Sequence, residues 1–217
     1  MNRFRIPCFL ALATFSLCIA LGATADAWKP SLMPAAEETS EALAAGPLSI
    51  RAGAGVYLLG AEGFVLARPS QNGFHCLVER SQEGAFEPQC FDAEGSETLL
   101  PAVLLAAELV QTGHSREEVE RRVAAAWAEG RLRAPSRPGI NYMLSEKNRV
   151  PVGPERVTPF GPHLMFYAPY LTDADLGGDG NGETSPIFMI NEGKPGGYVI
   201  VSVDGTDGHR GAGASDP

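Results

Sequence analysis

Residues 72–92 read NGFHCLVERSQEGAFEPQCFD and combine a turn signal with two short extended runs. Asn72-Gly73 lies between two apolar runs, which predicts the two-residue turn of a β-hairpin, because both central positions of a type I′ turn need a positive φ. Alternation after this turn places Phe74, Cys76 and Val78 on one face of a strand. The stretch therefore predicts part of a β-sheet, with His75, Leu77 and Glu79 on the other face.

Cys76 and Cys90 lie on either side of a polar loop at residues 81–87. In an exported chain, two cysteines placed in this way predict a structural disulfide. A metal pair and a redox pair are the alternatives. The thirteen intervening residues are far from the C-x-x-C spacing of a redox motif, and no second cysteine pair follows residue 25 to complete a zinc site. The structural disulfide is therefore favoured.

Residues 1–25 have the pattern of an export signal peptide. Arg3 and Arg5 form a short positive region, residues 9–21 are mostly apolar, and Ala23-Thr24-Ala25 offers a cleavage site. The apolar run is too short to span a membrane, although an uncleaved anchor is the alternative. Cleavage predicts an exported protein, periplasmic or extracellular, with no membrane span in the mature chain.

The acidic composition argues against nucleic-acid binding. The whole chain has a formal net charge of −9, and removal of Arg3 and Arg5 with the signal peptide takes it to −11. Such a surface repels phosphate groups, and no basic cluster offsets it locally. The partner we expect is instead a small molecule of unknown identity or another component of the cell envelope.

The mature chain, of roughly 190 residues, suits a single domain with its own core. Residues 26–49 are rich in Ala, Glu, Ser and Pro and predict a flexible leader, within which residues 37–45 could form a short helix. Residues 50–203 are assigned to one domain. Residues 204–217, rich in Gly, Asp and Ser, predict a disordered tail.

Residues 101–130 have a helical period. A largely apolar helix follows Pro101 and ends at Gly113. The sequence Ser115-Arg116-Glu117-Glu118 is typical of a capping box and starts a second helix that ends at Gly130. This second helix has an apolar stripe at four-residue intervals, formed by Val119, Val123 and Trp127. The two helices predict an αα-hairpin.

Short apolar runs predict strands before and after the helices. They lie at residues 56–59, 64–67, 74–78, 88–92, 140–145, 163–167, 187–190 and 198–203. Because strands and helices come in blocks rather than in strict alternation, the fold class is α+β. We expect an antiparallel or mixed sheet of about six to eight strands, packed on the helical hairpin.

Three side chains in the second half of the chain are candidate catalytic residues. His163 lies at the entrance of a strand and could act as a general base. Tyr142 and Ser145 come from the preceding strand, and Ser145 with Lys147 resembles a Ser/Lys hydrolase pair, but with S-x-K spacing instead of S-x-x-K. The alternative is that His163, like His75, is a hydrogen-bonded strand histidine without a catalytic role.

Residues 173–183 form an acidic, glycine-rich loop with oxygen ligands that suit calcium. The EF-hand register fails, however, because Pro186 stands where the bidentate glutamate belongs. A solvated surface loop is favoured. No phosphate-binding glycine motif occurs in the sequence, and we expect no cofactor and no metal site.

Two stretches resemble a group of uncharacterised exported bacterial proteins. They are N-G-F-x-C-L-V, from Asn72 to Val78, and P-H-x-M-x-Y-A-P, from Pro162 to Pro169, with Tyr142-Met143-Leu144 between them. The resemblance covers residues 50–203 and implies a bacterial exported protein. It supplies no catalytic residue, because no activity is assigned to the group.

Two functions remain open. The first is a non-catalytic exported domain that binds a small molecule or another envelope component. The alternative is a hydrolase-like enzyme with a site around His163, Tyr142 and Ser145. The first is favoured, because the sequence contains no complete catalytic set.

Overall fold

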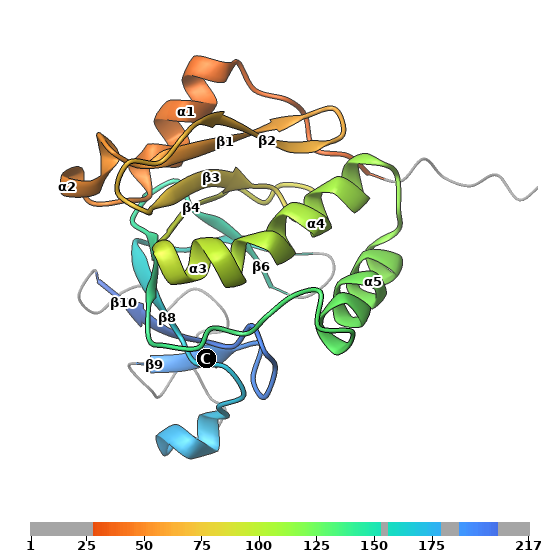
Figure 1. Cartoon of the computed structure of the whole chain (residues 1–217), viewed down its shortest axis with the longest axis vertical. Helices are drawn as coiled ribbons and strands as arrows, with labels where there is room; N and C mark the ends of the chain where they lie inside the picture. Colours follow the sequence, from red (N-terminus) through yellow and green to blue (C-terminus); the bar gives the residue numbers. More distant parts are fainter. Residues whose placement is uncertain (1–27, 153–155, 179–186, 204–217) are drawn as a thin grey trace, which may run out of the picture.

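The computed structural model describes residues 28–152, 156–178 and 187–203. The predicted signal peptide and the predicted C-terminal tail lie outside these ranges. The fold is α+β, with a mixed eight-stranded sheet, a separate two-stranded ribbon and helices against both faces of the large sheet (Figure 1). The predicted fold class is therefore confirmed.

The sheet runs in the order β2-β1-β3-β4-β5-β8-β10-β9, and β6 and β7 form the separate ribbon. The strands are β1 (Gly55–Gly60), β2 (Gly63–Arg68), β3 (His75–Glu79), β4 (Glu87–Phe91), β5 (Ile140–Met143), β6 (Arg149–Pro151), β7 (Val157–Pro159), β8 (His163–Tyr167), β9 (Ile187–Ile190) and β10 (Tyr198–Ser202). The helices are α1 (Ala35–Ala44), α2 (Leu48–Arg51), α3 (Ala93–Thr98), α4 (Leu100–Gln111) and α5 (Arg116–Ala128), with a 3₁₀ turn η1 (Asp173–Leu176).

The hairpin predicted at Asn72-Gly73 is wrong. β3 pairs with β1 in parallel, and β2 forms an edge of the sheet, so β2 and β3 are not neighbours. A parallel neighbour cannot be reached through a two-residue turn. The Asn72 side chain instead shapes a longer connection, because its Nδ2 donates to Ile50 O at 2.8 Å and its Oδ1 accepts from Phe74 N at 3.1 Å.

The predicted αα-hairpin is confirmed as α4 and α5. Pro101 lies in the first turn of α4. The Ser115 hydroxyl caps α5 by accepting from Glu118 N at 3.3 Å, while the Glu118 carboxylate accepts from the side chains of Arg121 and Arg122. The short helix α3 was not predicted; its cap is Asp92, whose carboxylate accepts from Gly95 N at 2.9 Å.

Part of the predicted flexible leader is a packed helix. α1 lies against the sheet at β1, β3 and β4, and Ala42 and Ala45 have no exposed surface. α1 therefore packs against strands of the segment assigned to the domain. Small alanines allow a close approach to the sheet, but they produce a weak hydrophobic period in the sequence.

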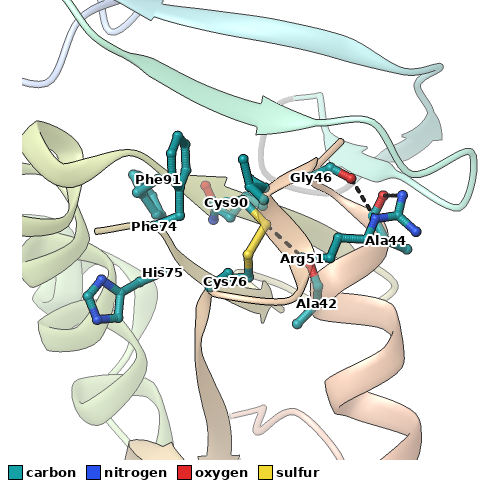
Figure 2. The surroundings of a disulfide bond; sticks show 12 residues. Ala42, Ala44, Gly46, Arg51, Phe74, His75, Cys76, Cys90 and Phe91 are labelled. Carbon is teal, nitrogen blue, oxygen red and sulfur yellow. Dashed lines mark hydrogen bonds between the residues drawn. A yellow bond between two sulfur atoms is a disulfide. The ribbon is translucent and has the colours of Figure 1, made fainter. Parts of the chain in front are cut away.

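The two faces of the sheet carry separate cores. Cys76, Val78 and Cys90 pack under α1, whereas Leu77 and Phe91 pack on the other face, together with residues of α4. This alternation confirms that Cys76 and Val78 share a face, and both faces of β3 are buried. Figure 2 shows the confirmed Cys76–Cys90 disulfide beside Ala42 of α1, with His75 directed away from it.

Candidate functional site

The three predicted catalytic residues do not all lie on one face of the sheet. In the ladder between β5 and β8, Met143 lies opposite His163 and Tyr142 lies opposite Leu164. Because successive side chains of a strand point to opposite faces, His163 and Tyr142 lie on opposite faces of the sheet. Ser145 follows the end of β5, and its Oγ accepts from Lys147 N at 3.2 Å.

His163 is deeply buried, with 1% of its surface exposed. Its Nδ1 lies 2.9 Å from Gly161 O, and its ring meets that of Phe160 edge-on at a centroid distance of 4.6 Å. Burial lowers the pKa of His163 to about 4, so the ring is neutral near pH 7. These contacts match the hydrogen-bonded strand histidine that was the alternative to a general base.

The second strand histidine, His75, contacts a serine. Its Nδ1 lies 3.1 Å from Ser96 Oγ, and burial lowers its pKa. A serine beside a histidine is the start of a nucleophile–base arrangement. Ser96 Oγ also lies within 3.4 Å of the carbonyl oxygens of Gly73 and Phe91, and no carboxylate in the described ranges hydrogen-bonds His75. The contacts fit a structural role at the start of α3.

The acidic loop lies partly outside the described residues, because the structure describes it only up to Gly178. Within the described part, the Asp175 carboxylate accepts from Thr172 N and Oγ1, and Asp173 Oδ1 accepts from Met189 N at 3.0 Å. Across the described ranges, no three His, Cys, Asp or Glu side chains gather in a way that could hold a metal ion.

A pair of carboxyl groups that the sequence did not predict lies where β3 ends and β4 begins. Glu79 and Glu87 form the last pair of the β3–β4 ladder and stand directly opposite each other. Directly opposite residues of antiparallel strands have Cβ atoms about 5 Å apart. Both side chains are half-buried and lie on the same sheet face as Leu77.

A chain of hydrogen bonds connects this pair to the centre of the sheet. Ser81 Oγ donates to Glu87 Oε2 at 2.6 Å, and Gln89 Nε2 donates to Glu79 Oε2 at 2.6 Å. Asn141 Nδ2 donates to Gln89 Oε1 at 2.7 Å. The network therefore spans β3, β4 and β5.

The surroundings of the pair raise the pKa of both carboxyl groups. Burial raises the pKa of Glu79 to about 7, and burial together with the charge of Glu79 raises the pKa of Glu87 to about 8. The sequence holds one signal for this pair. Glu79 follows Cys76 by three residues, and Glu87 precedes Cys90 by three residues. An antiparallel register that sets Cys76 opposite Cys90 therefore also sets Glu79 opposite Glu87.

We expect the free energy of unfolding to fall as the pH rises from about 5 to about 8. In the unfolded chain, glutamates titrate at a pKa of about 4.3, so in this window the folded state binds more protons and stability decreases with pH. Glu87→Gln should be more stable than the wild type by at least about 2 kcal/mol at pH 8.5 and equally stable at pH 4.5. Urea unfolding at both pH values measures this difference.

The matched control is Glu62→Gln, because Glu62 is exposed in the turn between β1 and β2. It should keep the pH dependence of the wild type. A wild-type stability that stays level from pH 5 to pH 8 would contradict the raised pKa values.

A pocket of about 410 Å³ lies between the N-terminal segment and the β3–β4 loop. One wall comes from residues 28–33, ahead of α1, and the other from residues 80–86. Apolar side chains are supplied by Trp28, Pro30, Met33, Ala85 and Phe86, and charged side chains by Lys29, Arg80 and Glu83.

A buried ion pair fixes the two walls to the domain. Arg80 Nη2 binds Glu38 Oε1, and the two side chains are 7% and 1% exposed. Arg80 Nη1 donates to Ser31 O at 3.2 Å, and Glu38 Oε1 accepts from Leu59 N at 3.2 Å. Burial raises the pKa of Glu38 and lowers that of Arg80, while each charge opposes the shift of the other. The pair ties the N-terminal segment and α1 to β1 and β3.

Within the described ranges, no helix has both the length and the apolar character needed to cross a membrane. Comparison of the chain with protein-family models, with curated proteins and with solved structures found no match. The resemblance to exported bacterial proteins stays a prediction, and any function must rest on the geometry described above.

Proposed function

We propose that the protein is an exported binding domain that captures a small, largely apolar molecule in the pocket between residues 28–33 and the β3–β4 loop. The observation that carries the proposal is the pocket itself. Its volume of about 410 Å³ lies within the range of about 300–1,000 Å³ that is typical of small-molecule sites. Its apolar walls with a few charged groups are also typical of such sites.

The anchoring of the pocket supports binding. Arg80 lines the pocket and also pairs with the buried Glu38, so one wall is held in position before any ligand arrives. A site that exists in advance loses less conformational entropy on binding than one that must be ordered. The signal-peptide pattern and the disulfide support an extracytoplasmic location for this binding.

The arrangement of the candidate catalytic residues favours binding over the hydrolase alternative. His163 and Tyr142 point to opposite faces of the sheet, and the nearest hydrogen-bond partner of His163 is a backbone carbonyl. A general base must lie within hydrogen-bond reach of the proton that it abstracts.

A screen of aromatic and aliphatic fragments by saturation-transfer NMR tests the proposal on the mature protein. Phe86 lines the pocket, so Phe86→Ala should weaken a bound fragment about tenfold, or about 1.4 kcal/mol. Phe166 on β8 is 40% exposed and does not line the pocket, so Phe166→Ala is the matched control and should leave the affinity unchanged. Circular dichroism of both variants checks that they remain folded.

Binding should also change the fluorescence of Trp28, which lines the pocket, whereas Trp127 packs against the core. A Trp28→Phe variant separates the two signals. The proposal fails if no fragment binds, or if every bound fragment is insensitive to Phe86→Ala.

A further inference from the structure

The loop between β3 and β4 links the pocket to the carboxyl pair. Arg80 and residues 83–86 of this loop line the pocket. The residues on either side of the loop are Glu79 and Glu87, which form the last ladder pair before it. A change in the interaction between these two side chains therefore acts at both ends of the loop that forms one pocket wall.

We propose that protonation of the Glu79/Glu87 pair holds the β3–β4 loop in place, and that ionisation of both carboxyls at higher pH opens the end of the ladder and loosens the pocket wall. The effect of the loosened wall on ligand binding rests on the proposed function. The movement of the loop is independent of the proposed function, because it follows from the carboxyl pair alone.

The physical basis is the direct opposition of two acidic side chains. Like charges directly opposite each other on neighbouring strands destabilise the pairing. A carboxyl that keeps its proton can instead donate a hydrogen bond to its neighbour. Gln89 Nε2 donates to one oxygen of Glu79, whereas Ser81 donates to Glu87 from its hydroxyl and from its backbone N–H. We expect the second oxygen of Glu79 to take part in sharing a proton with Glu87.

The charged groups around the loop do not bind the carboxyl pair in the described structure. Arg80 lies on the opposite side and binds Glu38. Arg149, on β6, donates to Gly84 O at 3.3 Å, and Arg116, on α5, donates to Gln82 Oε1 at 2.8 Å.

Three further groups lie around the loop, one of which is Glu83 of the loop itself. Arg156 offers its carbonyl oxygen to Gln82 Nε2, and Tyr198 of β10 is a titratable group that faces Glu79. In the described part of the chain, the carboxyls therefore have donors from neutral side chains but no bound cation to compensate a second negative charge. The pKa values of about 7 and 8 place the change in the loop near neutral pH.

Hydrogen exchange of the mature protein, followed by mass spectrometry from pH 5.5 to pH 9, tests the proposal. After correction for the intrinsic pH dependence of exchange, amide protection in residues 80–86 should fall about tenfold, with a midpoint between about pH 7 and pH 8. Peptides from α5 serve as an internal reference and should show no such midpoint. Glu87→Gln should keep the protection at high pH, whereas Glu62→Gln should lose it as the wild type does.

Protection of residues 80–86 that is constant across this range in the wild type overturns the proposal. The proposal is also overturned if Glu87→Gln and Glu79→Gln lose amide protection at high pH as the wild type does. If one of these variants does not fold, the result from the other decides the test. The exchange experiment contains no ligand, so the two proposals can fail separately. A failed fragment screen would overturn the proposed binding function and leave the pH-dependent loop movement standing. Exchange in residues 80–86 without a pH midpoint would overturn the loop movement and leave the proposed binding function standing.

Discussion

Replacing Arg80 with methionine should destabilise the protein by about 3–5 kcal/mol, because Glu38 would be left buried without its cation. The free energy of unfolding from urea titration at pH 7 measures this loss. Arg80→Met keeps much of the side-chain volume, so a cavity contributes little to the expected effect. The same substitution removes the hydrogen bond to Ser31 O and should loosen residues 28–33.

A double variant separates the unpaired charge from the loss of packing. Glu38→Leu combined with Arg80→Met removes both charges, and it should recover most of the loss, since apolar replacements of buried ion pairs are often neutral or stabilising. The control is Arg121→Met, which breaks an ion pair with Glu118 on the exposed surface of α5 and should cost less than about 1 kcal/mol. A cost for Arg80→Met as small as that of Arg121→Met would show that the buried pair does not hold the pocket walls.

Removing the Cys76–Cys90 disulfide should cost about 3 kcal/mol in the chain-entropy model, for a sequence separation of 14 residues. Cys76→Ala with Cys90→Ala is the suitable variant, because both sulfurs are fully buried under α1 and serine hydroxyls would add an unsatisfied polar group. Urea unfolding of the variant and the wild type measures the difference.

A thiol assay on unreduced protein that lacks residues 1–25, unfolded in denaturant, provides an independent check of this disulfide. It should detect no free thiol, whereas two titratable thiols would contradict the bond. The reduced wild type should match the double variant in stability, apart from the small effect of the two lost sulfurs.

The pocket and the carboxyl pair share one structural element, the β3–β4 loop. Below its ends, the disulfide joins β3 and β4 three residues from Glu79 and Glu87, so the ladder there is held covalently. Movement after ionisation should therefore be confined to the loop and its last pair. This makes residues 80–86 the segment in which structure, pH and binding should be coupled.

Much of the local structure could be predicted from the sequence. The apolar runs predicted the strands of the large sheet, the Ser115 cap and the Val119 stripe predicted α5, and the spacing of Cys76 and Cys90 predicted their bond. These features depend on residues close together in the chain, where period, capping and loop length act directly. The candidate catalytic group was chosen in the same way, but nearness in the sequence does not bring Tyr142 and His163 to one face.

The sequence by itself determined the α+β class, the positions of most strands and helices, and the disulfide. Only the tertiary structure decided that β3 pairs in parallel with β1, that α1 belongs to the core, and that Glu79 and Glu87 meet in a half-buried position. Residues 72–92 show the difference. Their alternation and the spacing of Cys76 and Cys90 predict the strand faces and the disulfide, but Asn72-Gly73 predicts a hairpin turn that the structure does not contain. The physical reason is that strand order, burial and pKa shifts depend on which distant segments exclude water from one another, and neighbouring residues in the chain do not specify that.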